Sequence, residues 1–120
     1  MIAELLGTWL LESFRIEDTN GTLSDWGKNA HGLLIYTSDG HMSVSINSDK
    51  SKNILDSILF YAGTFRVEGN VVKHQVTEAS DPARIGQELI SHMEFKNDCL
   101  ILTTQKESFG HAIVVWKRSK

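Results

Sequence analysis

His74 is the residue whose setting in the sequence best suits chemistry, because it alternates with apolar neighbours in a run typical of a β-strand. An imidazole can donate and accept hydrogen bonds, and it can move a proton near neutral pH. Burying it without a partner costs about 1–3 kcal/mol, so we expect something to bond to it. Two interpretations stay open. His74 is either a polar anchor or acid–base group for a ligand, or a structural histidine bonded by Tyr61, Ser91, Thr104 or water.

Further residues are predicted to share an inward face with His74. Tyr61, Glu78, Ser91 and Thr104 should lie near one end of that face, where they could hydrogen-bond a carbonyl or hydroxyl group. We expect the Glu78 carboxylate to stay in water at the rim, because carboxylates are rarely buried unpaired. The apolar residues predicted to contact a ligand are Phe65, Met93, Leu89, Val44, Ile46 and Val76. Such side chains either line a cavity or fill the interior of a small barrel.

Other chemistry finds little support in the residue pattern. The five histidines (31, 41, 74, 92 and 111) form neither a His-x-His nor a His-Glu-x-x-His motif, so we expect no metal site and no cofactor. Gly-x-Ser-x-Gly and phosphate-binding glycine motifs are absent from the sequence. Cys99 follows a tight turn and should point outward, which does not suit a nucleophile. Catalysis is therefore left open, and binding is preferred.

The elements that position these residues are predicted to be strands. Turn signals such as Asn20-Gly21 and Asp39-Gly40 separate runs rich in β-branched residues, and Pro82 lies outside all of them. One short helix is expected near residues 51–58, where apolar residues recur one turn apart. The eight predicted strands are 7–17, 32–37, 42–47, 59–68, 71–78, 88–96, 99–105 and 111–117. Eight short strands in sequence order predict an all-β fold, an antiparallel up-and-down barrel without exposed edges.

The predicted hairpins decide which side chains face inward. A two-residue loop at Gly69-Asn70 places Phe65 opposite His74 and Tyr61 opposite Glu78. A similar loop lies at 97–98, and a three-residue loop at 38–40 has a left-handed glycine. These three tight turns fall at one end of an up-and-down barrel, and the longer connections fall at the other. Such a barrel, closed at one end and apolar inside, is suited to one small ligand.

Length and composition agree with this architecture and exclude other classes. The chain of 120 residues is predicted to form a single domain over 1–120, with 41% apolar and 22% charged residues. A net charge of −3 disfavours nucleic-acid binding. Neither a membrane span of ~20 apolar residues nor a secretory leader is expected. One cysteine excludes an intramolecular disulfide and suits a reducing compartment, so we expect the protein in the cytoplasm.

Several sequence blocks resemble one protein family. They include Gly7-Thr8-Trp9, a Gly-x-Trp opening of the first strand, then 32–43, Tyr61-Ala62-Gly63, 72–76, 100–104 and the ending Trp116-Lys117-Arg118. In this order they resemble the lipocalin-like domain family of calycin-type barrels. The segment before Tyr61 is shorter than many members have, and the chain ends two residues after Arg118.

The resemblance implies a lipocalin-type barrel whose first tryptophan plugs the closed end. Trp9, Trp116 and Arg118 are the expected structural residues there, with Arg118 or Lys117 stacked on the Trp9 ring. It implies little about activity, because a shared fold does not transfer function.

The sequence thus supports three hypotheses of different kinds. The first is binding of a small, mostly apolar molecule inside the barrel, oriented by His74 with Tyr61, Ser91 and Thr104. The second is a cyclase or isomerase of a natural-product-like substrate, with His74 moving a proton. The third is an accessory or stress protein with a filled core that acts through its surface, with a homodimer as one arrangement left open.

Overall fold

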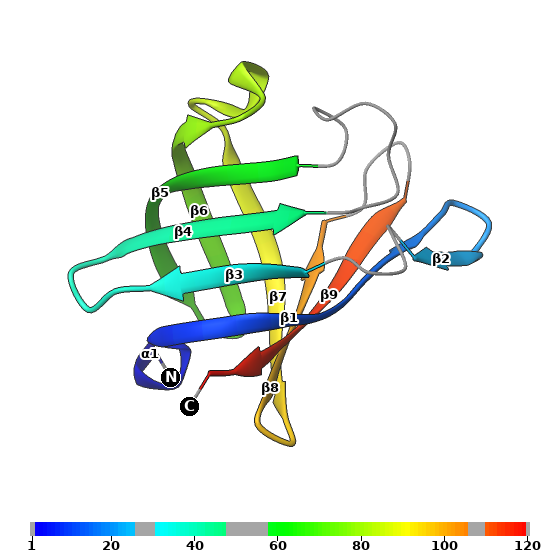
Figure 1. Cartoon of the computed structure of the whole chain (residues 1–120), viewed down its shortest axis with the longest axis horizontal. Helices are drawn as coiled ribbons and strands as arrows, with labels where there is room; N and C mark the ends of the chain where they lie inside the picture. Colours follow the sequence, from blue (N-terminus) through cyan, green and yellow to red (C-terminus); the bar gives the residue numbers. More distant parts are fainter. Residues whose placement is uncertain (1, 26–30, 48–57, 106–109, 120) are drawn as a thin grey trace.

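The computed structural model describes residues 2–25, 31–47, 58–105 and 110–119, and most of them lie in β-strands (Figure 1). The strands are β1 Gly7–Glu17, β2 Leu23–Asp25, β3 His31–Tyr36, β4 His41–Asn47, β5 Ile58–Glu68, β6 Val71–Ala79, β7 Glu88–Lys96, β8 Cys99–Thr104 and β9 His111–Arg118. Two short helices complete the described chain, α1 at Ile2–Leu5 and the 3-10 helix η2 at Pro82–Arg84. None of the described helices is long and apolar enough to cross a membrane.

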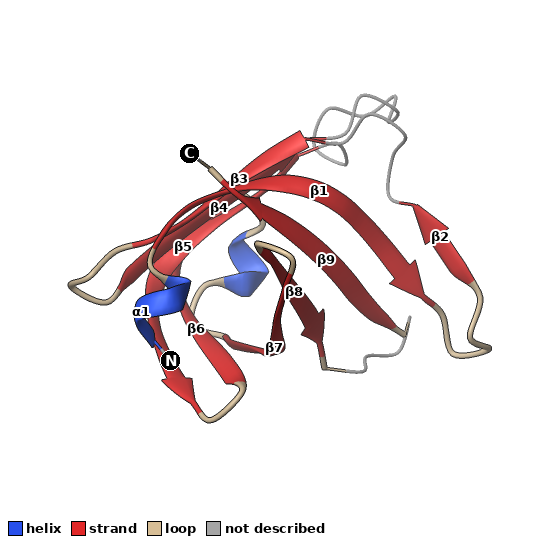
Figure 2. Cartoon of the chain, turned by 90° about the horizontal axis from the view of Figure 1, so that it is seen from below, coloured by secondary structure: helices blue, strands red, loops and turns tan. Residues whose placement is uncertain are grey.

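The strands close into a barrel because β1 pairs on both of its sides. Each strand from β3 to β9 lies antiparallel to its neighbour in sequence, while β1 pairs with β3 along one edge and with β9 along the other. The predicted eight-stranded antiparallel barrel is confirmed. The additional strand β2 pairs only with the last three residues of β1 and projects beyond the barrel wall (Figure 2). No strand was predicted there.

The three predicted tight turns are confirmed, and together they define the hairpin end of the barrel. Gly40 has a φ of 91°, and Tyr36 pairs with Met42, as the three-residue loop requires. Asn97 and Asp98 adopt φ values of 53° and 64°, the left-handed conformations of a two-residue hairpin. The opposite end, where β6 leads through η2 into β7, is called the loop end here.

One predicted register is wrong, because β6 has a bulge. Gly63 pairs with Val76 and the next pair is Ala62 with Glu78, which leaves Thr77 as an extra residue. Glu78 therefore turns outward and is exposed, and Ala79 takes its place opposite Tyr61. A Cβ at Gly63 would lie 1.9 Å from the carbonyl oxygen of Gln75, so the two strands approach too closely here for any other residue.

The helices differ from the one that was predicted. Residues 51–57 of the predicted helix lie outside the described residues, and Ile58 begins β5. The helix α1 was not predicted, and it lies at the hairpin end beside the end of β9 (Figure 1). Its residue Leu5 is fully buried, so this short turn closes the base of the core.

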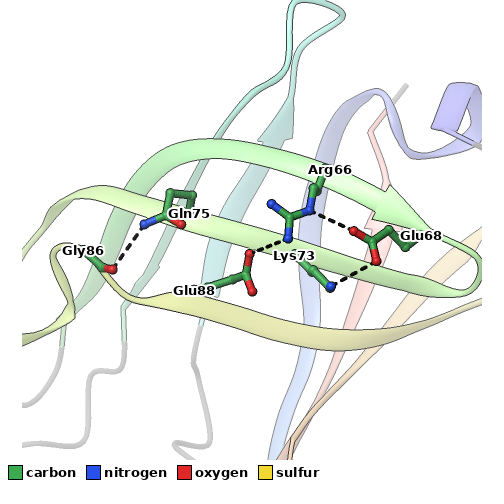
Figure 3. Close-up of polar contacts among 6 residues, drawn as sticks. All are labelled: Arg66, Glu68, Lys73, Gln75, Gly86 and Glu88. Atoms are coloured by element: carbon green, nitrogen blue, oxygen red, sulfur yellow. Dashed lines mark hydrogen bonds and ion pairs between the residues drawn. The ribbon is translucent and has the colours of Figure 1, made fainter.

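The interior of the barrel is apolar, and the outer face is charged. The buried core includes Leu34, Tyr36, Met42, Val44, Ile46, Val72, Val76, Leu100, Leu102, Val114 and Trp116. On the outer face of β5–β7, Arg66 lies 2.9 Å from Glu68 and 2.9 Å from Glu88, and Lys73 lies 3.0 Å from Glu68 (Figure 3). Exposed ion pairs of this kind contribute about 0–1 kcal/mol each, so they chiefly mark this face as the solvated one.

Candidate ligand site

His74 is hydrogen-bonded at both ring nitrogens to tyrosines from two other strands. Its Nε2 lies 2.6 Å from the hydroxyl of Tyr36 on β3, and its Nδ1 lies 2.8 Å from the hydroxyl of Tyr61 on β5. His74 is only 3% exposed, so the three side chains form a polar trio inside the apolar barrel. Tyr61 was among the predicted partners, and Tyr36 was not.

The trio runs along the barrel from the hairpin end toward the loop end. Tyr36 is the last residue of β3, directly before the 37–40 turn, and it is 1% exposed. Its ring packs edge-on against Phe65, with 4.8 Å between ring centroids. His74 lies in the middle of β6, while Tyr61 pairs with Ala79, the last residue of that strand. Tyr61 is only partly buried, so the trio ends closer to solvent than it begins.

Burial dominates the acid–base properties of the trio. Desolvation lowers the pKa of His74 to about 4, so its imidazole is neutral at physiological pH. Burial, and then the neighbouring Tyr61, raise the pKa of Tyr36 well above its ordinary value. Burial also raises the pKa of Tyr61, and the positive charge of Arg84 acts in the opposite direction. All three groups are therefore neutral, and the trio holds three exchangeable protons.

The other predicted ligand-contacting residues lie on the inner face, but they do not bond to His74. Ser91 is 7% exposed and pairs with Thr104 across β7 and β8. The Thr104 hydroxyl accepts a hydrogen bond of 2.8 Å from the backbone amide of Ala112, which makes it part of the barrel wall. The apolar members are buried or partly buried: Val44, Ile46, Phe65, Val76, Leu89 and Met93.

The hairpin end is sealed by the residues expected there. The Trp9 indole N–H donates to the carbonyl oxygen of Leu5 at 2.9 Å, and the guanidinium of Arg118 lies 3.9 Å from the Trp9 ring centroid. Arg118 also donates to the carbonyl of Leu6 at 2.7 Å and to that of Glu4. Trp116, 2% exposed, fills the core beside them. Entry to the interior from this end is therefore blocked.

Arg84 is a residue that sequence analysis missed. It ends η2 at the loop end, and its Nε is, among the described residues, the one buried side-chain nitrogen or oxygen without a hydrogen-bond partner. Arg84 lies in the connection between β6 and β7, which has no regular alternation of apolar and polar residues. The sequence therefore does not indicate which side chains of this connection turn inward.

Two hollows on the surface lie apart from the trio. One of about 410 Å³ lies on the outer face of β1, β3 and β4, and its lining includes the exposed side chains of Leu10 and Leu33. The other, of about 220 Å³, lies at the hairpin end beside Trp9 and Cys99. Within the described ranges, no group of three His, Cys, Asp or Glu side chains is arranged to hold a metal ion.

The comparison with known families identifies the barrel. The model of a lipocalin-like domain family matches residues 6–119. The chain belongs to that family. This confirms the resemblance carried by the Gly-x-Trp opening and the blocks that follow it. No curated protein matches the sequence.

Solved structures of low sequence identity share the lipocalin-like fold. A variant of the fluorescent protein UnaG is 15% identical with a TM-score of 0.53, and covers 100% of this chain and 99% of its own. The REP1-NXSQ fatty acid transporter is 15% identical with a TM-score of 0.52, covering 98% of each chain. Fatty-acid-binding protein 1 of Echinococcus granulosus is 15% identical with a TM-score of 0.51, covering 98% of this chain and 99% of its own. At such identities the likeness establishes the fold alone.

Proposed function

We propose that this lipocalin-like barrel binds a small, mostly apolar molecule in its interior and orients it by a polar oxygen near Tyr61. The observation that carries the proposal is the hydrogen-bonded trio of Tyr36, His74 and Tyr61 inside an otherwise apolar wall. Buried polar networks add little net stability compared with apolar packing, so a core evolved for stability alone has no need of one. Hydrogen bonding to a ligand would give the trio a role that stability alone does not.

Entry from the loop end is supported by inward side chains on β5 and β7 that are only partly buried there, whereas Ile46 of β4 at that end is 2% exposed. Side chains at the base, such as Leu5, Trp9 and Leu100, are 0–1% exposed. Inward residues nearer the loop end, such as Tyr61 and Leu89, are only partly buried. A fatty acid transporter and a fatty-acid-binding protein have the same fold, which makes an apolar ligand a reasonable choice for the first binding tests.

The trio also favours a second candidate function. Three neutral groups in a hydrogen-bonded row can move a proton to or from a ligand, as an isomerase or cyclase requires. The two functions differ in one measurable respect. A catalytic role predicts that His74→Gln abolishes turnover of a bound enolisable compound while its binding persists, whereas a binding protein shows no turnover at any concentration.

A matched pair of substitutions on β7 tests binding inside the barrel. Leu89 lies opposite His74 on the inner face, while Ile90 lies opposite Lys73 on the outer face. The neutral dye Nile red should bind the wild-type protein saturably, at about one site, with increased fluorescence. Leu89→Trp should abolish that binding by filling the interior, and Ile90→Trp should preserve it.

Two results would contradict binding inside the barrel. Absence of saturable binding by a folded wild-type protein favours the filled-core alternative. Equal binding by the two tryptophan variants would place the dye on the surface.

Native mass spectrometry of the protein purified from its own host should show a retained small molecule.

A further inference from the structure

The direction of the hydrogen bonds in the trio follows from counting its protons. A neutral imidazole has one N–H donor and one bare nitrogen that accepts. Since His74 bonds to both tyrosines, one tyrosine must donate to it and the other must accept from it. The accepting tyrosine keeps its own hydroxyl proton free to donate elsewhere.

The burial of the two tyrosines decides which one has the free proton. Tyr36 is 1% exposed at the sealed base, and within the described part of the chain His74 is its one hydrogen-bond partner. Leaving its proton unbonded there would cost about 1–3 kcal/mol. Tyr36 therefore donates to Nε2, and the Nδ1–H of His74 donates to Tyr61. The hydroxyl proton of Tyr61 is therefore free to donate to a ligand or to water.

Arg84 brings a second donor to the same end. Tyr61 lies opposite Ala79, the last residue of β6. Directly after Ala79, the amide of Ser80 donates to the carbonyl of Phe60 at 2.9 Å, which fixes the start of the connection to β7. Further along, the amide of Gly86 donates to the carbonyl of Val76 at 2.9 Å, so this connection folds back against β6. Burial raises the pKa of Tyr61 and the positive charge of Arg84 opposes that rise, while the buried Nε of Arg84 has no hydrogen-bond partner among the described residues.

The acidic side chains closest in sequence to Arg84 are engaged elsewhere. The carboxylate of Asp81 accepts from the amide of Ala83 at 3.0 Å, and that of Glu88 lies 2.9 Å from Arg66 on the outer face. Glu78 turns outward because of the bulge in β6. Arg84 forms no ion pair with any of these three, so the positive charge at the loop end is not neutralised by them.

We propose that Tyr61 and Arg84 form a head-group site of hydrogen-bond donors at the loop end, which selects an apolar ligand carrying a carboxylate. The guanidinium of Arg84 has only donors and is positively charged, and Tyr61 adds its free hydroxyl proton, so together they fit an oxygen that accepts and is anionic. An alcohol of the same chain length would leave the charge of Arg84 uncompensated. The inference rests on the proposed binding of apolar molecules inside the barrel, and it adds the chemistry of the ligand's polar end.

Displacement of bound Nile red by two matched ligands tests the head-group site. Decanoic acid and decanol have the same tail and differ in charge, and the dye itself is neutral. We expect the wild-type protein to prefer the acid by about tenfold or more, and Arg84→Gln to lose most of that preference, because each tenfold is about 1.4 kcal/mol. Arg84→Lys keeps the charge and should retain part of the preference.

Lys117→Gln is the matched control, since it removes one positive charge from an exposed side chain at the hairpin end. It should leave the preference for the acid unchanged. Tyr61→Phe should weaken displacement by the acid, because the second donor is lost. Each variant is first shown to unfold in one cooperative thermal transition well above the temperature of the binding assay.

The possible failures of the two proposals differ. If Nile red binds but acid and alcohol displace it equally, or if Arg84→Gln keeps the full preference, the head-group site is wrong and binding inside the barrel stands. If neither the dye nor decanoic acid binds to the folded protein, both proposals are wrong.

Discussion

His74 should make the stability of the protein depend on pH in a defined window. Burial lowers its folded pKa to about 4, against about 6.5 in an unfolded chain. Between these values the unfolded chain binds the proton and the folded protein does not, so the free energy of unfolding decreases as the pH falls. Below about pH 4 both states are protonated, and the contribution of His74 levels off.

The size of this effect follows from the two pKa values. One pKa unit corresponds to about 1.4 kcal/mol, so the full difference is about 3 kcal/mol. About 2 kcal/mol of it should be lost between roughly pH 7 and pH 5, where only the unfolded chain gains the proton. His74 is 3% exposed, so screening by solvent does little to reduce this figure.

Urea unfolding at a series of pH values measures the effect, with His74→Gln as the reference protein. The glutamine amide can still donate to one tyrosine and accept from the other, but it does not titrate. Carboxylates and the other histidines contribute equally to the two pH profiles. The wild-type profile should therefore fall by about 2 kcal/mol more than the variant profile between roughly pH 7 and pH 5.

Parallel profiles for the two proteins would refute the assignment of His74 as a desolvated, neutral imidazole. The same conclusion would follow from an NMR titration in which the His74 ring protons titrate at or above about pH 6.5. Either result would also remove the basis for counting three protons in the trio.

Four further substitutions have expected effects on the free energy of unfolding, each measured by urea denaturation. Trp9→Ala should cost about 3–5 kcal/mol, because it removes the buried plug and the ring beneath Arg118; a loss below about 1 kcal/mol would contradict the sealed base. Tyr36→Phe should cost about 1–3 kcal/mol and Tyr61→Phe less, since water can replace only the partner nearer the loop end; the reverse order would contradict the direction of the hydrogen bonds. Gly63→Ala should cost more than about 2 kcal/mol, because its Cβ would lie 1.9 Å from a backbone oxygen; a near-neutral effect would contradict the close approach.

Local patterns were sufficient to predict the barrel. Alternating apolar residues and turn residues such as Gly40 act over a few positions, so they can be read from the chain directly. The same rules placed Phe65 opposite His74, as the structure has it. They failed at Glu78, because a bulge adds one residue and reverses every side chain beyond it. Strict alternation cannot represent that insertion.

The site was predictable only where it depends on neighbouring strands. Tyr61 and His74 lie on the paired strands β5 and β6, so hairpin register brought them together. Tyr36 reaches His74 across the interior from β3, which pairs with neither of those strands. That contact depends on the curvature of the whole barrel. A single sequence has no local pattern that reports it.

Arg118 and Arg84, at opposite ends of the barrel, differ in whether their hydrogen-bond donors have partners. Arg118 at the hairpin end stacks on Trp9 and donates to two backbone carbonyls, so its hydrogen-bonding capacity stabilises the base. Arg84 at the loop end buries an Nε for which no described residue provides an acceptor. Leaving a buried charged donor unbonded costs free energy that stability alone would select against. Under our proposals, the carboxylate of a bound ligand accepts a hydrogen bond from Arg84 and offsets that cost. Ligand binding should therefore stabilise the loop end. Decanoic acid should therefore raise the melting temperature of the wild-type protein more than that of Arg84→Gln.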